Sequence, residues 1–316
     1  MKKFLLPGLL LLATFTKAET TFLYTQPFVY EVDSILRNNP ISGFTQNIAG
    51  IATYDVGITD QIPKWNVSDF TGLQIPDSEK FKSERTVDAT WYGSTAIQTY
   101  NNSIATQLHT YSSPYRNDRS LKTISINLDF SEDRLARPWN GDYGQNAKLC
   151  MGFFAAVPSS WTGDGSHNES GANFSLRDIS TGRYFTIGAL LYSSSGATEY
   201  IGFDGGAGSL NIPMVSTYFG SQNFITTTPG SASSRTATWD DDTYFGFCLT
   251  RQNIELIVNE VNKNYPNYNF TVENLVLGTA NLGSEISTGD PNAGELGRKD
   301  GHMATRFTEW TILIEN

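Results

Sequence analysis

The chain has 316 residues, of which 39% are hydrophobic, 13% aromatic and only 17% charged, and its formal net charge is −10. An acidic chain without a cluster of Lys and Arg repels phosphate backbones and anionic lipid headgroups, which argues against nucleic acid or an anionic membrane surface as partner. Neutral polymers, cations and other proteins fit this charge better.

Residues 1–18 have the layout of a cleaved secretory signal. A positive start is followed by the apolar stretch Phe4–Leu12, and the segment ends at the small residue Ala18. The apolar stretch is too short to span a bilayer, which argues against the alternative of a membrane anchor. No other segment is apolar for long enough to be a transmembrane span. We therefore expect an exported bacterial chain that starts near Glu19 and acts in the periplasm, at the cell surface or outside the cell.

Strand-like segments between turn residues make up most of the mature chain. The clearest alternation is KTISINLDF at 122–130, where Ile, Ile, Leu and Phe face one way and polar residues face the other. A hairpin is expected at 173–194, with its turn at 178–182. The other candidates, in chain order, are 20–32, 49–58, 85–93, 95–103, 148–157, 198–208, 233–239, 243–249, 270–278, 282–287 and 302–315. In the last of these, Phe307, Trp310, Ile312 and Ile314 form the expected inward set, with a one-residue slip at 308–309.

No internal repeat and no low-complexity linker divides these segments. We therefore expect one domain over 19–316, with 131–147, where Pro, Gly and Asn concentrate, as the one candidate boundary.

The chain has two cysteines, Cys150 and Cys248, each inside a strand candidate. In an oxidising compartment such a pair predicts one disulfide, between neighbouring strands or facing sheets. The alternative of reactive or metal-binding thiols lacks a histidine near either cysteine in the sequence.

One segment, about 250–263, has helical spacing. Ile254, Ile257, Val258 and Val261 fall on one helix face, Thr250 is a suitable N-cap, and Pro266 follows the end. Its polar face has no cluster that acts on a substrate, so we expect a scaffold helix that covers an end or edge of the sheets.

From Cys150 to Asn316 the chain resembles the concanavalin A-like lectin and glucanase superfamily. The resemblance is carried by NFSLRDISTGRYFTIGALLY, EYIGFDGGAGSL, YFGFCLTRQNIELIVNEVN and HMATRFTEWTILI. It implies a jelly roll of two sheets, often with a concave glycan-binding face. The catalytic carboxylate signature of the glucanase members is missing, and the ligands of legume-type lectins have no residue-by-residue match. The expected fold is therefore all-β, a jelly-roll-like antiparallel β-sandwich with one covering helix.

Familiar catalytic patterns are absent. The three histidines, His109, His167 and His302, are scattered, and the chain has no Gly-x-Ser-x-Gly elbow, no phosphate-binding loop and no dinucleotide fingerprint. Glu-x-Asp-x-x-Glu does not occur, and the adjacent acids at 132–133 and 240–242 lie in turns. A polysaccharide hydrolase or lyase then requires carboxylates that are distant in sequence and meet in space.

Two loops combine a large ring with an acid: Trp139 with Asp142, and Trp161 with Asp164. A sugar ring stacks on an aromatic face while carboxylates and amides bind its hydroxyls, so these four residues are the candidate glycan ligands. The alternative is that both tryptophans fill the core. Asp290 and Asn292 are calcium candidates, but the following residues do not fit an EF-hand, and an Asp-Pro turn explains the stretch as well. No cofactor is otherwise indicated.

The sequence thus predicts an exported β-sandwich that binds carbohydrate or a cell-surface or matrix protein without turning it over. A polysaccharide hydrolase or lyase on the same scaffold, and a structural subunit of an extracellular appendage or matrix, are the alternatives.

Overall fold

A computed structural model describes residues 20–25, 34–36, 44–47, 64–69, 95–100, 103–109, 121–130, 137–162, 166–196, 198–204, 212–234, 242–288 and 301–316. The expected signal, 1–18, lies outside these residues. No helix among the described residues is both long and apolar enough to cross a membrane.

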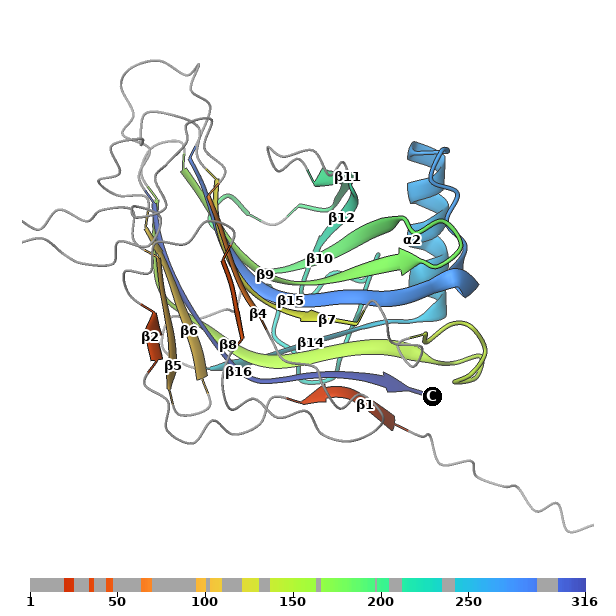
Figure 1. Cartoon of the computed structure of the whole chain (residues 1–316), viewed down its shortest axis with the longest axis horizontal. Coiled ribbons are helices and arrows are strands. Elements are labelled where there is room, and N and C mark those ends of the chain that lie inside the picture. The colour runs from red at the N-terminus through yellow and green to blue at the C-terminus, as the bar shows by residue number, and fades with distance from the viewer. Residues whose placement is uncertain are drawn as a thin grey trace, which may run out of the picture.

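Two β-sheets of eight described strands each form a sandwich (Figure 1). Sheet A contains β1 (Thr20–Thr25), β2 (Ser34–Leu36), β5 (Thr95–Tyr100), β6 (Ser103–His109), β8 (Lys148–Thr162), β13 (Thr226–Thr227), β14 (Thr243–Leu249) and β16 (Gly301–Glu315). Sheet B contains β3 (Phe44–Asn47), β4 (Lys64–Asp69), β7 (Leu121–Asp129), β9 (Ser166–Asp178), β10 (Tyr184–Ser193), β11 (Tyr200–Asp204), β12 (Ile212–Tyr218) and β15 (Leu275–Thr288).

The strand order of sheet A is β13-β14-β8-β16-β6-β5-β2, with β1 paired to β16, and that of sheet B is β11-β12-β10-β9-β15-β7-β4-β3. The predicted all-β sandwich is confirmed. Strands on both sides of the candidate boundary at 131–147 pair with each other, β7 with β15 and β6 with β16. Such pairings are what a single domain over 19–316 requires.

One strand pair of the predicted antiparallel sandwich is parallel. Among the described strands, β10 and β12 pair in parallel, while β11 pairs antiparallel with β12. The chain leaves β10, forms β11 at the sheet edge and returns as β12 between the two. Because β11 comes between β10 and β12 in the sequence but not in the sheet, β12 runs in the same direction as β10.

The core lies between the sheets and is rich in aromatic rings. Phe153 of β8 contacts Phe219, Phe245 and Phe307 at centroid distances of 5.8, 6.0 and 5.9 Å. Phe307, Trp310, Ile312 and Ile314 are all 0% exposed, so the inward set predicted for the last strand is confirmed. The predicted slip also occurs: the register of β16 against β8 shifts between 308 and 311, where Glu309 has φ +55°.

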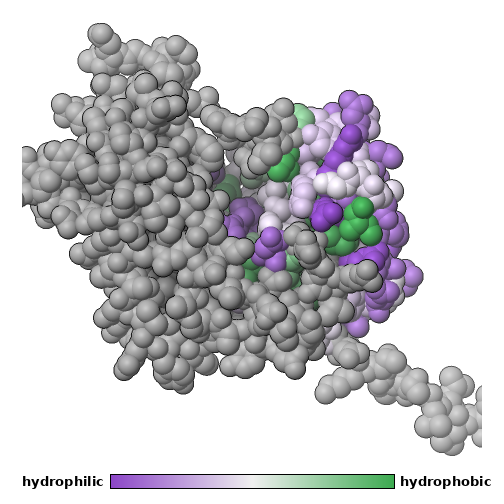
Figure 2. Space-filling view, viewed as in Figure 1, coloured by the Kyte–Doolittle hydropathy of each residue, from purple (hydrophilic) through white to green (hydrophobic). Residues whose placement is uncertain are grey.

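The predicted helix is α2 (Arg251–Asn264), followed by the 3₁₀ turn η2 (Val272–Asn274). Thr250 is the N-cap: its hydroxyl accepts the backbone N–H of Asn253 at 3.1 Å, while the Asn253 side chain accepts the Thr250 N–H at 3.1 Å. The side chains of Ile254, Ile257 and Val261 are fully buried, which confirms the covering role. The helix stands at one end of the sandwich, where the described surface is largely hydrophilic (Figure 1, Figure 2).

Cys150 of β8 and Cys248 of β14 are directly opposite in register and form a disulfide. The predicted bond between neighbouring strands is confirmed. A disulfide is typical of an oxidising compartment.

Candidate functional site

The predicted glycan ligands do not form a site in the described part of the chain. Trp139 is only 2% exposed, and its backbone carbonyl accepts a hydrogen bond from Arg251 at 3.3 Å. A ring buried in the core cannot stack on a sugar, so the ligand role predicted for Trp139 is wrong and the alternative of a core tryptophan is correct. Asp142 is exposed, and it exchanges hydrogen bonds with Asn140 that close a local turn.

The other candidates stay predictions. Trp161 lies in β8, where its backbone pairs with His302 of β16, and its side chain is outside the description. Asp164 and the calcium candidates Asp290 and Asn292 lie outside the described residues.

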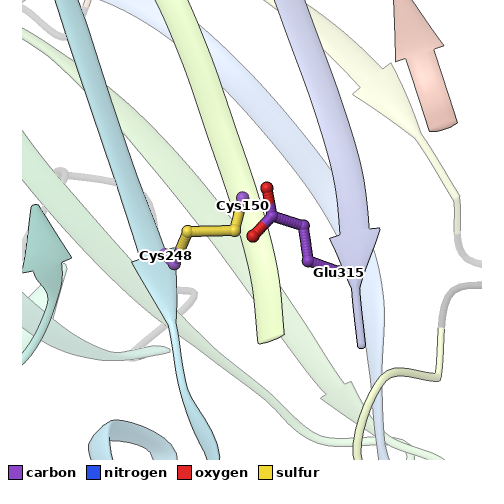
Figure 3. Close-up of side chains that lie close together, drawn as sticks. All are labelled: Cys150, Cys248 and Glu315. Atoms are coloured by element: carbon purple, nitrogen blue, oxygen red, sulfur yellow. A yellow bond between two sulfur atoms is a disulfide. The ribbon is translucent and has the colours of Figure 1, made fainter. Parts of the chain in front are cut away.

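Within the described ranges, one group of three potential metal ligands comes together: Cys150, Cys248 and Glu315 (Figure 3). Its two sulfur atoms are bonded to each other, and the Glu315 carboxylate forms an ion pair with Lys148 at 2.6 Å. Disulfide sulfurs are not thiolates, and thiolates are the form in which cysteine binds metals. This group is therefore not a metal site.

The face of sheet B that points away from sheet A is polar. The long strands bend, and sheet B lies on the inside of the bend (Figure 1). In β9 and β15, Ala172, Phe174, Ala280 and Leu282 are fully buried, whereas the residues that alternate with them are partly exposed. We call this surface the polar face and define it by Ser125, Asn127, His167, Glu169, Gly171, Asn173, Asn281, Gly283 and Glu285.

A row of three asparagines crosses the polar face. Asn127 of β7, Asn281 of β15 and Asn173 of β9 are directly opposite one another. The amide of Asn173 donates to the side-chain oxygen of Asn281 at 2.7 Å. On the next strand is Gly188, and a Cβ there would come within 2.6 Å of the Asn173 side-chain oxygen. The absence of a side chain at 188 therefore leaves room for Asn173.

The next row contains two glycines. Gly283 of β15 is opposite Gly171 of β9, and the row continues to Ser125 on one side and Leu190 on the other. A Cβ at Gly171 would lie 2.8 Å from the backbone oxygen of Ala189, so this position accepts only glycine without a shift of backbone. Two glycines therefore lie side by side in the middle of this row.

Beyond the glycines, two carboxylates are directly opposite each other: Glu169 of β9 and Glu285 of β15. His167, two residues before Glu169, hydrogen-bonds the Glu169 carboxylate through Nε2, and both side chains are more than two-thirds buried. The hydrogen bond to Glu169 raises the pKa of His167, burial opposes this, and the charges of Glu169 and Glu285 add to the increase. Like charges directly opposite destabilise a sheet, and a protonated His167 offsets that repulsion.

The turn between β9 and β10 sets the register of these two strands. The Asp178 carboxylate accepts the backbone N–H groups of Ser180 at 2.8 Å and Thr181 at 3.0 Å, and Gly182 has φ +70°. Burial raises the pKa of Asp178, but the hydrogen bonds from Ser180, Thr271 and Thr181 outweigh it and lower the pKa. A carboxylate that stays ionised at this turn fixes the hairpin predicted at 173–194, and with it the position of Asn173.

The sequence contains a signal for this site that the spacing of neighbouring acidic residues did not reveal. β9 reads Glu-x-Gly-x-Asn from 169 to 173, and β15 reads Asn-x-Gly-x-Glu from 281 to 285. The two patterns are the reverse of each other. When the strands pair antiparallel, equal residues fall opposite each other, as they do here. The carboxylates are distant in sequence and close in space, as the hydrolase alternative requires.

No protein-family model matches the chain, and no curated protein matches it in sequence. The structure is similar to two solved structures of a family 12 xyloglucanase from Bacillus licheniformis, the native enzyme and the enzyme in complex with ligand. The sequence identity is 10%, and the match covers 78% of this chain and 98% of the xyloglucanase chain, with TM-scores of 0.31 and 0.30. At these TM-scores, neither match says anything about individual residues of this chain. The two-sheet sandwich is established by the strand pairing alone.

Proposed function

We propose that this is an exported glycan-binding protein and that the polar face of sheet B binds a neutral polysaccharide chain. The observation that carries the proposal is the matched set of rows across β7, β15 and β9. Amides, glycines and carboxylates follow one another along the strands in register.

The rows suit a sugar chain in chemistry and in size. Amides donate and accept hydrogen bonds and carboxylates accept them, so both rows bind hydroxyl groups. Glu169 and Asn173 are four residues apart on β9, which at about 3.3 Å per residue separates the two rows by about 13 Å. The glycine row lies between them, so neither Gly171 nor Gly283 places a side chain between the two polar rows.

The charge selects against acidic glycans. The two carboxylates on this face and the net charge of −10 repel uronic acids and sulfated sugars. Neutral hydroxylated polymers meet no such repulsion. The glycine row ends at Leu190 of β10 and Tyr218 of β12, which are paired in register and partly exposed. These side chains offer apolar surface to the C–H face of a sugar.

Hydrolysis is the second candidate, and one observation favours it. Directly opposite residues of antiparallel strands have Cβ atoms about 4.5–5.5 Å apart. The carboxyl groups of Glu169 and Glu285 lie two bonds beyond these Cβ atoms, on side chains whose rotamers can bring them to the separation of about 5–5.5 Å that retaining glycosidases use. In that reaction Glu169, held by His167, would act as the nucleophile, and Glu285 as the general acid.

Binding is tested by calorimetry of the protein with neutral polysaccharides, using Asn281→Ala and a matched control, Asn259→Ala on the exposed side of α2. We expect Asn281→Ala to weaken binding about tenfold or more, equivalent to about 1.4 kcal/mol. Asn259→Ala should bind as the parent does. If Asn281→Ala also binds as the parent does and melts normally, the glycan site is not the polar face.

A reducing-end assay separates binding from hydrolysis. A parent that binds but releases no reducing ends is a binding protein. Release that Glu285→Gln abolishes, with binding retained, identifies a hydrolase. A parent that binds no glycan leaves the assembly-subunit alternative.

A further inference from the structure

A pocket of about 460 Å³ lies on the outer face of sheet A, over β8, β14 and the second half of β16. The polar face belongs to the other sheet and points the opposite way, so the two surfaces are separate. The disulfide Cys150–Cys248 and the side chain of Glu315, which lie close together (Figure 3), are part of the lining of this pocket.

An aromatic platform forms one part of this lining. Gly152 and Gly246 are directly opposite on β8 and β14, and Tyr244 lies over both. A Cβ would come within 2.8 Å of the Tyr244 hydroxyl at Gly152 and within 2.5 Å at Gly246. The phenol ring therefore lies low over the sheet only because both positions are glycine. The ring of Phe154 is beside it, at a centroid distance of 5.4 Å.

Hydroxyl groups around the pocket act mainly as acceptors. Thr226 donates to the Asn253 side chain at 2.8 Å, and Thr228 donates to the Tyr244 hydroxyl at 3.3 Å. Thr311 donates to the backbone carbonyl of Glu309 at 3.3 Å. Because these hydrogens are already engaged, the oxygens that line the pocket are left to accept hydrogen bonds, which suits a ligand rich in hydroxyl groups.

The backbone conformation of Glu309 is a second feature of this pocket that indicates a ligand. Its φ of +55° lies in the left-handed region, which is unfavourable for a residue with a Cβ. The side chain is exposed and lines the pocket. Backbone strain of this kind gathers at binding and catalytic sites. Glycine would relieve the strain at this bulge, yet the chain keeps a carboxylate there.

We propose that this pocket is a second carbohydrate site, in which a neutral sugar ring stacks on Tyr244, with the tilted ring of Phe154 at its side, and donates its hydroxyl hydrogens to Glu309 and the threonine oxygens. Charge favours a neutral ligand: Lys148 neutralises Glu315 across 2.6 Å, which leaves Glu309 to repel an anion. A sandwich with a site on each outer face binds two stretches of polysaccharide at once, which raises its avidity for an extended polymer.

The test uses neutral oligosaccharides of four to six glucose, galactose, mannose or xylose units in calorimetric titrations. All variants are made in the Asn281→Ala background, which weakens binding at the proposed polar-face site about tenfold or more. Tyr244→Ala should weaken the remaining binding tenfold or more. Phe203→Ala, which removes a ring of sheet B that is 40% exposed, should leave it unchanged.

Glu309→Gly distinguishes a ligand role from a structural one. It should weaken binding about fivefold or more while keeping or raising the melting temperature, because glycine adopts the left-handed backbone without strain. A structural role predicts a lower melting temperature instead, and that result overturns the proposal. So does an Asn281→Ala chain that binds none of these oligosaccharides, or binding that neither Tyr244→Ala nor Glu309→Gly weakens. If Asn281→Ala binds as the parent does but Tyr244→Ala abolishes binding, the polar-face proposal fails and the pocket proposal stands.

Discussion

Truncation of Ile257 tests whether α2 is part of the folded core. The side chain is 0% exposed, and Ile257→Ala removes three carbon atoms from a packed environment. At about 0.8 kcal/mol per buried methylene, the lost transfer free energy is roughly 2.4 kcal/mol. The cavity left behind adds to this, so we expect the free energy of unfolding to fall by about 3–4 kcal/mol. Urea denaturation measures the change as a lower midpoint with an unchanged slope.

The neighbouring residue provides the control. Leu256 is 41% exposed on the same helix, so Leu256→Ala removes a similar volume from the solvent side. Its effect should be about 0.5 kcal/mol or less. Similar small losses for both variants would show that the helix does not pack on the sandwich, and the reasoning from its apolar face would be refuted.

Two further predictions concern pH and oxidation. Because the hydrogen bond that His167 donates to Glu169 raises the pKa of His167 above its usual 6.5, the protonated imidazole stabilises the fold at low pH. This contribution is complete below pH 6.5 and is lost as the pH rises through the higher pKa of the folded state. The urea midpoint of His167→Gln should therefore depend less on pH between 5.5 and 8.5 than the midpoint of the parent does. Replacing Cys150 and Cys248 by serine opens a loop between residues 98 apart. This double substitution should lower the free energy of unfolding by about 4–5 kcal/mol. A parent protein that keeps two free thiols after oxidation in the native state would contradict the disulfide.

Much of the fold could be predicted because its signals are local. The period of Ile254, Ile257 and Val261 is that of one helix face, and a Thr precedes it at the N-cap position. The slip in the last strand was readable because the inward set, Phe307 and Trp310, breaks the period of two. Local periodicity fixes which residues face inward, since a strand or helix has only one way to bury an apolar set.

The site was harder to predict because it depends on which strands are neighbours. Glu169 and Glu285 become a pair only through the β9–β15 register, and neither residue has a local pattern of its own. Trp139 shows the opposite failure. Its surroundings, Asn-Gly-Asp, read as an exposed loop, yet Arg251, 112 positions further along the chain, donates to its carbonyl and the ring is buried. Whether a loop residue is buried depends on contacts with residues that are distant in the sequence, and the local composition of the loop does not show these contacts.

The position of β16 in sheet A has a consequence for the order in which the protein folds. This strand follows all the other described strands in the sequence, yet it lies between β8 and β6 and also pairs with β1. Until β16 emerges, β13-β14-β8 and β6-β5-β2 cannot join, and the edges of β8 and β6 stay open to wrong partners. Such late, long-range pairing makes folding slow and prone to aggregation. A truncation within β16 therefore divides the sheet at its middle, whereas a truncation of β1 removes only a short strand beside it.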